Sequence, residues 1–158
     1  MAEIYNHYVV NTVVTFEVEA ISIASMIERI SETSPSFPWL AAEYEGALVG
    51  YAAASPWKSR CAYRYAVEST IYMRRDCVGK GWGTLLYRRL IEEVRRLGFH
   101  SMLGGIALPN PPSQRLHEKL AFKKIAHFAQ VGRKFERWID VGYWQLLLSP
   151  TSLGARRG

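Results

Sequence analysis

The spacing of hydrophobic residues predicts a helix followed by a hairpin in the first third of the chain. Between residues 22 and 34 apolar side chains recur at helical intervals, and a segment with two prolines, residues 35–38, ends the pattern. Residues 39–44 and 47–54 are short apolar runs on either side of Glu45-Gly46, a pair typical of a turn. This part of the chain is therefore expected to form one helix and two paired strands.

The central region predicts a strand, a glycine-rich loop and an amphipathic helix. A polar, partly aromatic loop is expected over 55–62, and a strand over 63–73. After the glycine-rich loop, leucine, isoleucine and valine recur at helical spacing over 85–97, and Gly98 is the expected helix stop. This helix has the clearest pattern in the chain.

The last third predicts strands around one short helix. Residues 101–107 indicate a buried strand, and a short helix is expected to end near Leu120. Two late strands, 122–131 and 141–148, are expected to be joined by the basic and aromatic segment 132–140. The whole order predicts a mixed α/β fold with one sheet between helices.

Composition is consistent with one domain. The chain has 158 residues, of which 49% are hydrophobic, enough for one substantial core. We expect a single domain over 1–150 and a short tail over 151–158. No apolar run approaches the roughly 20 residues that span a bilayer, so no membrane association and a cytoplasmic location are expected. Cys61 and Cys77 lack metal-site spacing, which favours reduced structural thiols.

A net charge of +6 suits an acidic partner. Several of the basic residues fall on the exposed face of the predicted central helix, and a solvated face is favoured there over a nucleic-acid surface. Arg74, Arg75 and Lys80 are better binding candidates because they flank the glycine-rich loop. They are expected to attract a small polyanion, and no nucleic acid is expected as a partner.

The most informative motif is the loop before the central helix, with glycine at positions 79, 81 and 83. A loop between a strand and a helix start presents free backbone N–H groups and the helix dipole, which favour a phosphate. It is not a Walker A loop, because Lys80 is followed by glycine, and it lacks the spacing of the dinucleotide fingerprint. The loop predicts a phosphorylated cofactor, with a plain tight turn as the alternative.

Other segments strengthen this interpretation. They are Val67 to Met73 (Val-Glu-Ser-Thr-Ile-Tyr-Met), Leu108 to Phe122 (Leu-Pro-Asn-Pro-Pro-Ser-Gln-Arg-Leu-His-Glu-Lys-Leu-Ala-Phe), Tyr5-Asn-His-Tyr-Val, Phe37-Pro-Trp-Leu, Pro56 to Tyr63, and Trp138 to Gln145. With the glycine loop, they make the chain resemble the GCN5-related N-acetyltransferases (GNAT), and within these the phosphinothricin N-acetyltransferases. The resemblance covers nearly the whole chain and implies a central, mostly antiparallel sheet flanked by helices.

The resemblance implies acetyl-CoA as co-substrate and no metal. Matching positions for cofactor contact are Met73, Val78, Gly79, Lys80, Gly81, Trp82, Gly83 and Thr84. Small residues are needed there because side chains would keep the backbone away from the pyrophosphate. Asn110 and Ser113 match positions along the pantetheine arm, and helix capping is the alternative for both.

The resemblance also implies catalytic residues. Most free amines are protonated at neutral pH and must lose a proton before they attack a thioester. Glu68 matches the general base, acting directly or through a water, whereas a strand glutamate is otherwise usually a surface residue. His117 lies where many relatives carry a tyrosine that protonates the CoA thiolate. An acid or relay role and a packing role are equally open for His117.

For the acceptor, the resemblance implies the amine of a small amino acid analogue such as phosphinothricin or methionine sulfoximine. Lys58, Arg60 and Tyr63 match positions that recognise its anionic groups, and an arginine fork suits a carboxylate. Phe16 and Tyr87 match the pocket wall, with packing in the core as their alternative.

Three departures from the family pattern stand out. Relatives have a first strand and most of a helix before the segment that starts at Ile4, so either the start of the sequence is misplaced or the sheet lacks its first strand and part of the first helix, which would expose an edge. Val78 replaces a common Arg or Gln. Ala121 replaces a glycine and is expected to fit only with a negative φ or a remodelled turn.

Other functions stay open at this point. They are acetyl transfer to another small amine, a non-catalytic CoA-binding regulatory module, and a nucleic-acid-binding domain that uses the basic helix face. The resemblance also implies a homodimer, for which the late strands with Trp138 and Trp144 are the candidate contacts.

Overall fold

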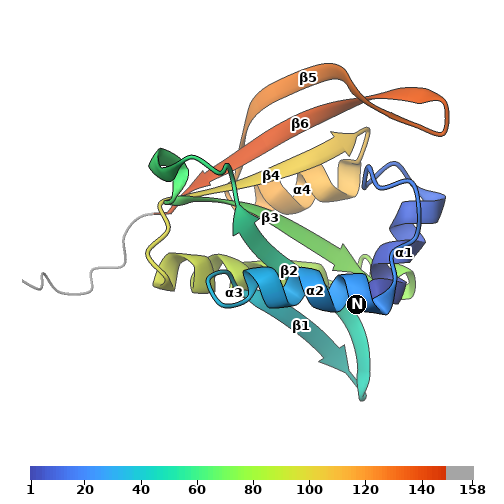
Figure 1. The fold of residues 1–158 in the computed structure, drawn as a ribbon, viewed down its shortest axis with the longest axis horizontal. Helices are drawn as coiled ribbons and strands as arrows, with labels where there is room; N and C mark the ends of the chain where they lie inside the picture. The colour runs from blue at the N-terminus through green and yellow to red at the C-terminus, as the bar shows by residue number, and fades with distance from the viewer. Residues whose placement is uncertain (149–158) are drawn as a thin grey trace, which may run out of the picture.

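The structure, a computed structural model, describes residues 1–148 (Figure 1). Its helices are α1 (Ala2–Asn11), α2 (Ile23–Thr33), α3 (Trp82–Arg96) and α4 (Pro111–Lys119). Its strands are β1 (Trp39–Tyr44), β2 (Ala47–Pro56), β3 (Ala66–Met73), β4 (Ser101–Leu108), β5 (Lys123–Lys134) and β6 (Arg137–Leu147). The expected tail over 151–158 lies outside the described residues.

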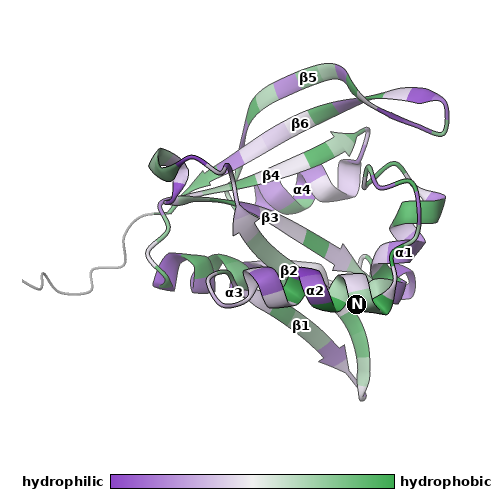
Figure 2. Cartoon of the chain, in the orientation of Figure 1, coloured by the Kyte–Doolittle hydropathy of each residue, from purple (hydrophilic) through white to green (hydrophobic). Residues whose placement is uncertain are grey.

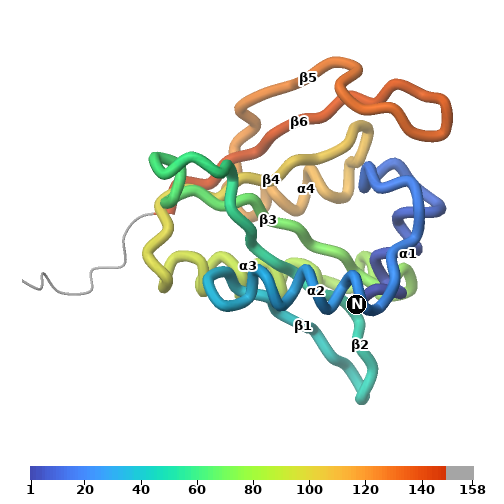
Figure 3. The backbone as a smooth tube through the Cα atoms, in the orientation of Figure 1, coloured from blue at the N-terminus to red at the C-terminus, as the bar shows by residue number. Residues whose placement is uncertain are grey.

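The six strands form one sheet in the order β1-β2-β3-β4-β6-β5. All neighbours are antiparallel except β3 and β4, which run parallel. These two strands pair only from Ala66 with Ser101 to Glu68 with Leu103, although each is eight residues long. Beyond Glu68 they separate, and the backbone traces diverge (Figure 3). The sheet therefore opens in its middle.

Two hydrophobic layers cover the faces of the sheet. On one face α3 packs Leu86, Leu90 and Val94 against a core that includes Val67 and Met102. A second cluster joins α1 and α2 to Tyr51 of β2. The strand β2 is hydrophobic along most of its length, while α2 alternates between hydrophobic and hydrophilic positions (Figure 2). The alternation marks α2 as a surface helix with one packed face.

Most predicted elements are confirmed, with shifted boundaries. Ser22 caps α2 by accepting a hydrogen bond from the backbone N–H of Ser25. The hairpin of β1 and β2 is present across Glu45-Gly46. The central helix begins three residues before the predicted start, at Trp82. Helix α1 was not predicted, although it supplies Ile4, Tyr5 and Val9 to the second core cluster.

Two boundary predictions are wrong. Tyr63 does not begin a strand, because residues Cys61–Tyr63 form a 3₁₀ turn and β3 starts only at Ala66. The segment 132–140 does not merely join the late strands, since β5 continues to Lys134 and β6 begins at Arg137. Phe135 and Glu136 both have positive φ, which makes the turn tight enough for long strands.

Ala121 keeps the turn that a glycine would make. Its φ is +67°, so the expected negative φ is wrong, and the turn is not remodelled. The N–H of Phe122 donates to the carbonyl of His117, five residues back, which is the closure of a Schellman motif. A left-handed alanine costs roughly 1–2 kcal/mol, and the Phe122 that follows it is 3% exposed in the core.

Candidate active site

Just past the point where β3 and β4 separate, β4 has two consecutive glycines that face opposite sides of the sheet. A Cβ on Gly105 would lie 3.2 Å from Oε1 of Glu68 on one face. A Cβ on Gly104 would lie only 2.3 Å from Nε2 of His117 on the other. Successive residues of a strand point to opposite faces, so the pair gives room to one ionisable side chain on each.

Glu68 is held in position by a tyrosine from β6. Tyr143 Oη donates to Oε1 of Glu68 over 3.2 Å. The two side chains can meet because strand pairing sets Tyr143 opposite Gly105, which has no side chain between them. Burial raises the pKa of Glu68, although the tyrosine hydrogen bond and the charge of Lys58 oppose the shift. Burial and the neighbouring carboxylate raise the pKa of Tyr143 to about 12, so it stays a hydrogen-bond donor. A carboxylate with one donor and a raised pKa is suited to taking up a proton.

Glu68 opens into the cavity that we call the acceptor cavity, of about 460 Å³, within the size range of small-molecule sites. Most of its walls are apolar or aromatic, and its lining comprises Val14, Phe16, Trp57, Lys58, Glu68, Gly105, Ala107, Phe128, Val131, Val141 and Tyr143. The ring of Tyr143 lies edge-on to both Trp57 and Phe128, with centroids 5.1 and 5.9 Å away. Lys58 Nζ lies 4.8 Å from the centroid of the Trp57 ring.

The loop between α1 and α2 closes one side of this cavity. Phe16 packs on the backbone of Gly132, where a Cβ would come within 2.4 Å of its ring. The ammonium of Lys134 donates to the carbonyl of Thr15 over 2.8 Å. Lys134 is only 3% exposed, and desolvation lowers its pKa. Two contacts thus fasten the loop to β5.

His117 lies in a buried chain of hydrogen bonds on the helix side of the sheet. Its Nδ1 is 2.8 Å from the Ser113 carbonyl, and its Nε2 is 3.0 Å from the Tyr87 hydroxyl. That hydroxyl lies 2.7 Å from Ser69 Oγ, which donates to the Leu103 carbonyl over 2.9 Å. The chain bridges β3 and β4 where they separate.

This hydrogen-bonded network has one hydrogen too few when His117 is neutral. The network runs from the Ser113 carbonyl to the Leu103 carbonyl through four contacts, and each contact needs one hydrogen. A neutral histidine, a tyrosine hydroxyl and a serine hydroxyl supply only three. Desolvation lowers the pKa of His117, so the neutral ring is favoured at neutral pH. A proton added at Nε2 would supply the fourth hydrogen. The hydrogen-bonded network therefore lowers the cost of transiently protonating His117, although both nitrogens of its ring already have partners.

The glycine loop has the backbone shape of an anion cradle. Gly79 and Gly81 have φ near +82° and +83°, and nothing in the described residues lies within 4 Å of a Cβ added at either. In the same described part of the chain, the amides of Gly79, Lys80 and Gly81 donate to no backbone carbonyl. These N–H groups stand at the start of α3, whose dipole favours an anion. The local geometry fits a pyrophosphate.

Other cofactor candidates have visible structural partners. The Asn110 side chain accepts a hydrogen bond from the Ser113 backbone over 3.3 Å and caps α4, the geometry of the capping alternative. Arg74 pairs with Asp76 at 2.7 Å, which compensates its charge, and Lys80 Nζ lies 5.3 Å from the centroid of the Trp82 ring. Lys80, over the Trp82 ring, and Arg75, which has no ion pair within residues 1–148, are thus the basic candidates whose charge is not compensated.

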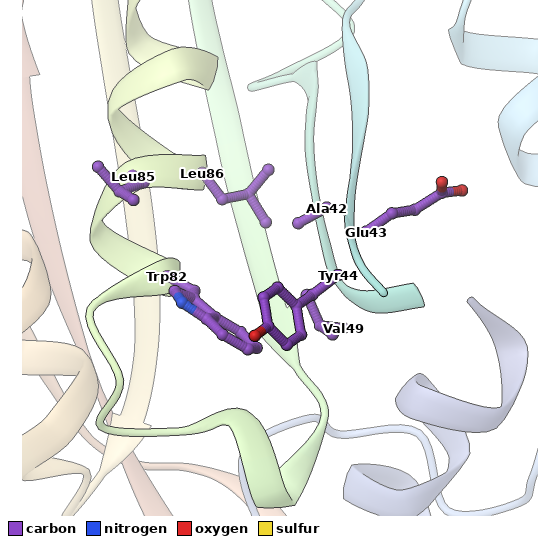
Figure 4. A pocket seen from close by; sticks show the side chains of 7 residues that line it. All are labelled: Ala42, Glu43, Tyr44, Val49, Trp82, Leu85 and Leu86. Atoms are coloured by element: carbon purple, nitrogen blue, oxygen red, sulfur yellow. The ribbon is translucent and has the colours of Figure 1, made fainter. Parts of the chain in front are cut away.

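A second cavity lies beside the start of α3, under the β1–β2 hairpin (Figure 4). Its volume is about 240 Å³, and its lining comprises Ala42, Glu43, Tyr44, Val49, Trp82, Leu85 and Leu86. The rings of Tyr44 and Trp82 pack against each other, with centroids 4.6 Å apart. Unlike the acceptor cavity, it contains no hydrogen-bonded pair of ionisable side chains among its lining residues.

The structure brings together only some of the predicted acceptor residues. Phe16 and Lys58 line the acceptor cavity with Glu68, whereas Arg60 and Tyr63 lie farther along the exposed loop and do not line it. Tyr87 is fully buried beside His117, the core packing that was its alternative. The wall residues Trp57, Phe128 and Tyr143 had no predicted role. One indication of a role for Tyr143 was present in the sequence, because this residue lies in the Trp138 to Gln145 segment that contributes to the family resemblance.

The predicted basic face of α3 is partly neutralised. Arg89 pairs with Glu93 at 2.7 Å and with Glu92 at 3.2 Å, and Arg96 pairs with Glu93 at 2.8 Å. Such pairs are typical of a solvated helix face. The described residues contain no group of three His, Cys, Asp or Glu side chains arranged to hold a metal ion. They also contain no helix with the length and apolarity to span a membrane.

Comparisons with known proteins agree with this geometry. A model of the Acetyltransferase (GNAT) family matches residues 1–122. The chain is 39% identical to a phosphinothricin N-acetyltransferase of Streptomyces viridochromogenes over 92% of this chain and 79% of that protein. It is 38% identical to an L-methionine sulfoximine/L-methionine sulfone acetyltransferase of Salmonella typhimurium, over 94% and 87% respectively.

Solved structures show the same fold. A GNAT superfamily phosphinothricin acetyltransferase from Sinorhizobium meliloti in complex with acetyl-CoA matches with a TM-score of 0.90 and 36% identity, covering 96% of this chain and 86% of that one. YncA from Salmonella typhimurium, solved with its cofactor acetyl-CoA, matches with a TM-score of 0.92 and 36% identity, covering 99% and 91%. The predicted resemblance and the mixed α/β fold are confirmed.

Proposed function

The chain belongs to the GNAT family of acetyltransferases, and from this membership we propose that it acetylates the amine of a small amino acid analogue, such as phosphinothricin or methionine sulfoximine. Acetyl-CoA is the acetyl donor, and we place the reaction in the cytoplasm. The observation that carries the proposal is Glu68, which points into a cavity of amino acid size with its pKa raised.

Glu68 acts as the general base. The incoming amine is an ammonium ion at neutral pH, and Glu68 accepts its proton directly or through one water. Tyr143 keeps the carboxylate oriented toward the cavity by donating to Oε1. Gly105 leaves the space beside that oxygen open for the amine.

The glycine loop holds the donor. The free backbone N–H groups of Gly79, Lys80 and Gly81 would hold the pyrophosphate, and Met73, Val78, Trp82, Gly83 and Thr84 would complete the cradle. Asn110 and Ser113, at the cap of α4, would lie along the pantetheine arm. Acetyl-CoA supplies an activated thioester, so no covalent enzyme intermediate is needed.

His117 assists on the opposite face of β4. When Nε2 takes up a proton from water, the hydrogen-bond chain through Tyr87 and Ser69 gains its fourth hydrogen, and the ring would then give that proton to the departing thiolate. Glu68 and His117 then act from opposite sides of the sheet opening. The role of His117 depends on a transient exchange of its Tyr87 contact.

We propose a homodimer through the late strands. Strand β5 is an edge of the sheet, and outside the acceptor cavity this region exposes Ile125, Phe135 and Trp138. Trp144, predicted as a contact from sequence, is wrong for this role because it is 1% exposed and donates to Glu118. Trp138, at 61% exposed, keeps its place at the proposed contact.

The experiment is release of CoA thiol from acetyl-CoA by the purified chain. The acceptor panel contains phosphinothricin, methionine sulfoximine, methionine sulfone, common amino acids and simple amines. Saturable release with the amino acid analogues is the expected result. Release only with unrelated amines contradicts the proposed acceptor, and saturable CoA binding without any release contradicts the enzyme.

A further inference from the structure

Strand β5 contains an irregularity where it forms part of the acceptor cavity. In the segment from Phe128 to Gly132, which we call the β5 bulge, β5 advances four positions while β6 advances two, from Val141 to Ile139. Gln130, in the middle of the bulge, has a φ of +51° and no register partner on β6 within the described residues. Extra residues of this kind bend a strand and change the direction of its side chains.

The β5 bulge shapes the acceptor side of the molecule through three of its residues. Phe128 and Val131 line the acceptor cavity. The ring of Phe128 also lies edge-on to Tyr143, the tyrosine that orients the proposed general base, with centroids 5.9 Å apart. Gly132 gives room to the ring of Phe16, which would meet any side chain at that position. The wall of the cavity and the support of the base therefore both depend on the shape of the bulge.

Asp140 of β6 holds the bulge from the opposite face of the sheet. Its Oδ1 accepts a hydrogen bond from the backbone N–H of Gln130 over 2.8 Å, and its Oδ2 lies 2.7 Å from Nε2 of His127. The Gln130 amide and, to a smaller extent, His127 keep the pKa of Asp140 below its ordinary value, so the carboxylate is ionised at neutral pH. The next residue, Val141, lines the cavity and Asp140 does not, as the alternation of a strand requires.

The two contacts of Asp140 are unequal in their effect on the bulge. The side chains of His127 and Asp140 are 45% and 37% exposed, and an ion pair so open to water contributes little to stability. The contact with Gln130 instead fixes a backbone group of a left-handed residue, a conformation that costs free energy for any residue except glycine. Its acceptor is charged, which strengthens the bond. The amide contact is therefore the one that sets the shape of the bulge.

Building on the proposed function, we propose that Asp140 is a positioning residue for acetyl transfer, which fixes the β5 bulge without touching either substrate. Without this carboxylate β5 can slip by one residue, and such a slip turns side chains to the other face of a sheet. Phe128 and Val131 would then leave the cavity wall, and Tyr143 would lose the ring that packs on its edge. Donor binding is spared, because the glycine loop shares no residue with the acceptor cavity.

Three variants separate the two contacts of Asp140. Asp140→Ala removes both, Asp140→Asn keeps an oxygen for the Gln130 amide, and His127→Ala removes only the imidazole. In Asp140→Ala we expect kcat/KM for methionine sulfone to fall about tenfold or more, with the KM for acetyl-CoA within about twofold. Asp140→Asn should recover most of the loss, and His127→Ala should stay within about twofold of the unaltered chain. An unchanged kcat/KM in Asp140→Ala, or an equal loss in His127→Ala, overturns the inference.

The matched control is Glu92→Ala, which removes another solvent-exposed ion pair, the one with Arg89 on α3. It should leave kcat/KM for the acceptor and the KM for acetyl-CoA within about twofold. A loss in Glu92→Ala as large as in Asp140→Ala would show a general effect of removing surface charge and would contradict the positioning role.

Hydrogen exchange at the Gln130 amide, followed by NMR, tests the structural step without reference to activity. We expect exchange in Asp140→Ala to be about tenfold faster or more, and to remain slow in His127→Ala. Faster exchange with unchanged kcat/KM contradicts the positioning role.

Calorimetric binding of methionine sulfone with CoA present separates this inference from the proposed function. If the unaltered chain transfers no acetyl group, the proposed function fails, and weaker sulfone binding in Asp140→Ala still supports a positioned cavity wall. Equal binding in the two proteins contradicts the inference whether or not turnover occurs.

Discussion

The two faces of β4 hold ionisable side chains in opposite states. On the helix face His117 has a hydrogen-bond partner at each ring nitrogen and is 4% exposed. On the acceptor face Glu68 has a single donor and faces an open cavity. Glu68 keeps spare acceptor capacity toward the cavity, whereas His117 can exchange a proton only while it gives up its Tyr87 contact. The sheet opening thus separates an open base from a buried histidine.

The largest effect is expected from replacing Glu68, the proposed general base. Glu68→Gln keeps the size of the side chain and its hydrogen bond from Tyr143, but it removes the proton acceptor. We expect kcat/KM to fall by roughly 10²- to 10⁴-fold with the melting temperature nearly unchanged. Steady-state release of CoA thiol and a thermal melt measure both quantities. A loss below about threefold would remove Glu68 from the mechanism.

The adjacent glycines provide a matched pair of variants for the two faces. In Gly104→Ala the new methyl group meets His117 at 2.3 Å, so we expect a loss of about 1–3 kcal/mol in the free energy of unfolding. In Gly105→Ala the methyl lies 3.1 Å from the Tyr143 ring and 3.2 Å from Glu68, so the main loss should be in kcat/KM for the acceptor.

Denaturant unfolding and acceptor kinetics of both variants measure the contrast. The KM for acetyl-CoA serves as the internal control in Gly105→Ala, because the glycine loop is not touched. If the two variants lose stability and activity in the same proportion, the faces are not separate in function.

The pH dependence of the activity tests the role of Glu68 further. Glu68 must be ionised to act, and its pKa is raised above the ordinary value of 4.5 by burial. Activity should therefore fall about tenfold per pH unit on the acidic side, with a midpoint above 4.5. The pH profile of kcat/KM should lose this limb in Glu68→Gln. A limb that persists in the variant would assign the titration to another group.

The smallest effect is expected at the end of α4. Ala121 has a φ of +67°, a region that glycine adopts freely. Ala121→Gly should raise the free energy of unfolding by about 1 kcal/mol while leaving kcat/KM unchanged. Chemical denaturation reports the gain, and a destabilised variant would show that the alanine methyl contributes more by packing than it costs in conformation.

The shape of the glycine-rich loop was predictable because its signals are local. Glycines at 79, 81 and 83 beside a patterned helix predict a phosphate loop without any tertiary information, and Gly79 and Gly81 have positive φ at the start of α3. Ala121 shows the limit of a local rule. An alanine in place of glycine favoured a remodelled turn, whereas the structure keeps the left-handed residue and the hydrogen bond from Phe122 to the His117 carbonyl.

The acceptor side was less predictable because it is built by strand register. Tyr143 reaches Glu68 because β6 pairs with β4 so that Gly105 stands opposite Tyr143, 38 residues along the chain. No spacing in the sequence reports such a contact. Tyr87 illustrates the reverse case, since a helical tyrosine assigned to the pocket wall lies in the buried network behind the sheet.

The fastening of the α1–α2 loop to β5 has a consequence for how this protein can change. Phe16 and Thr15 on one side, with Gly132 and Lys134 on the other, form a wall that shares no element with the glycine loop or α3. Substitutions in this wall can retune which amine is accepted while donor activation stays intact. Recognition and activation are thus separable modules, and new acceptor preferences can evolve here without rebuilding the catalyst.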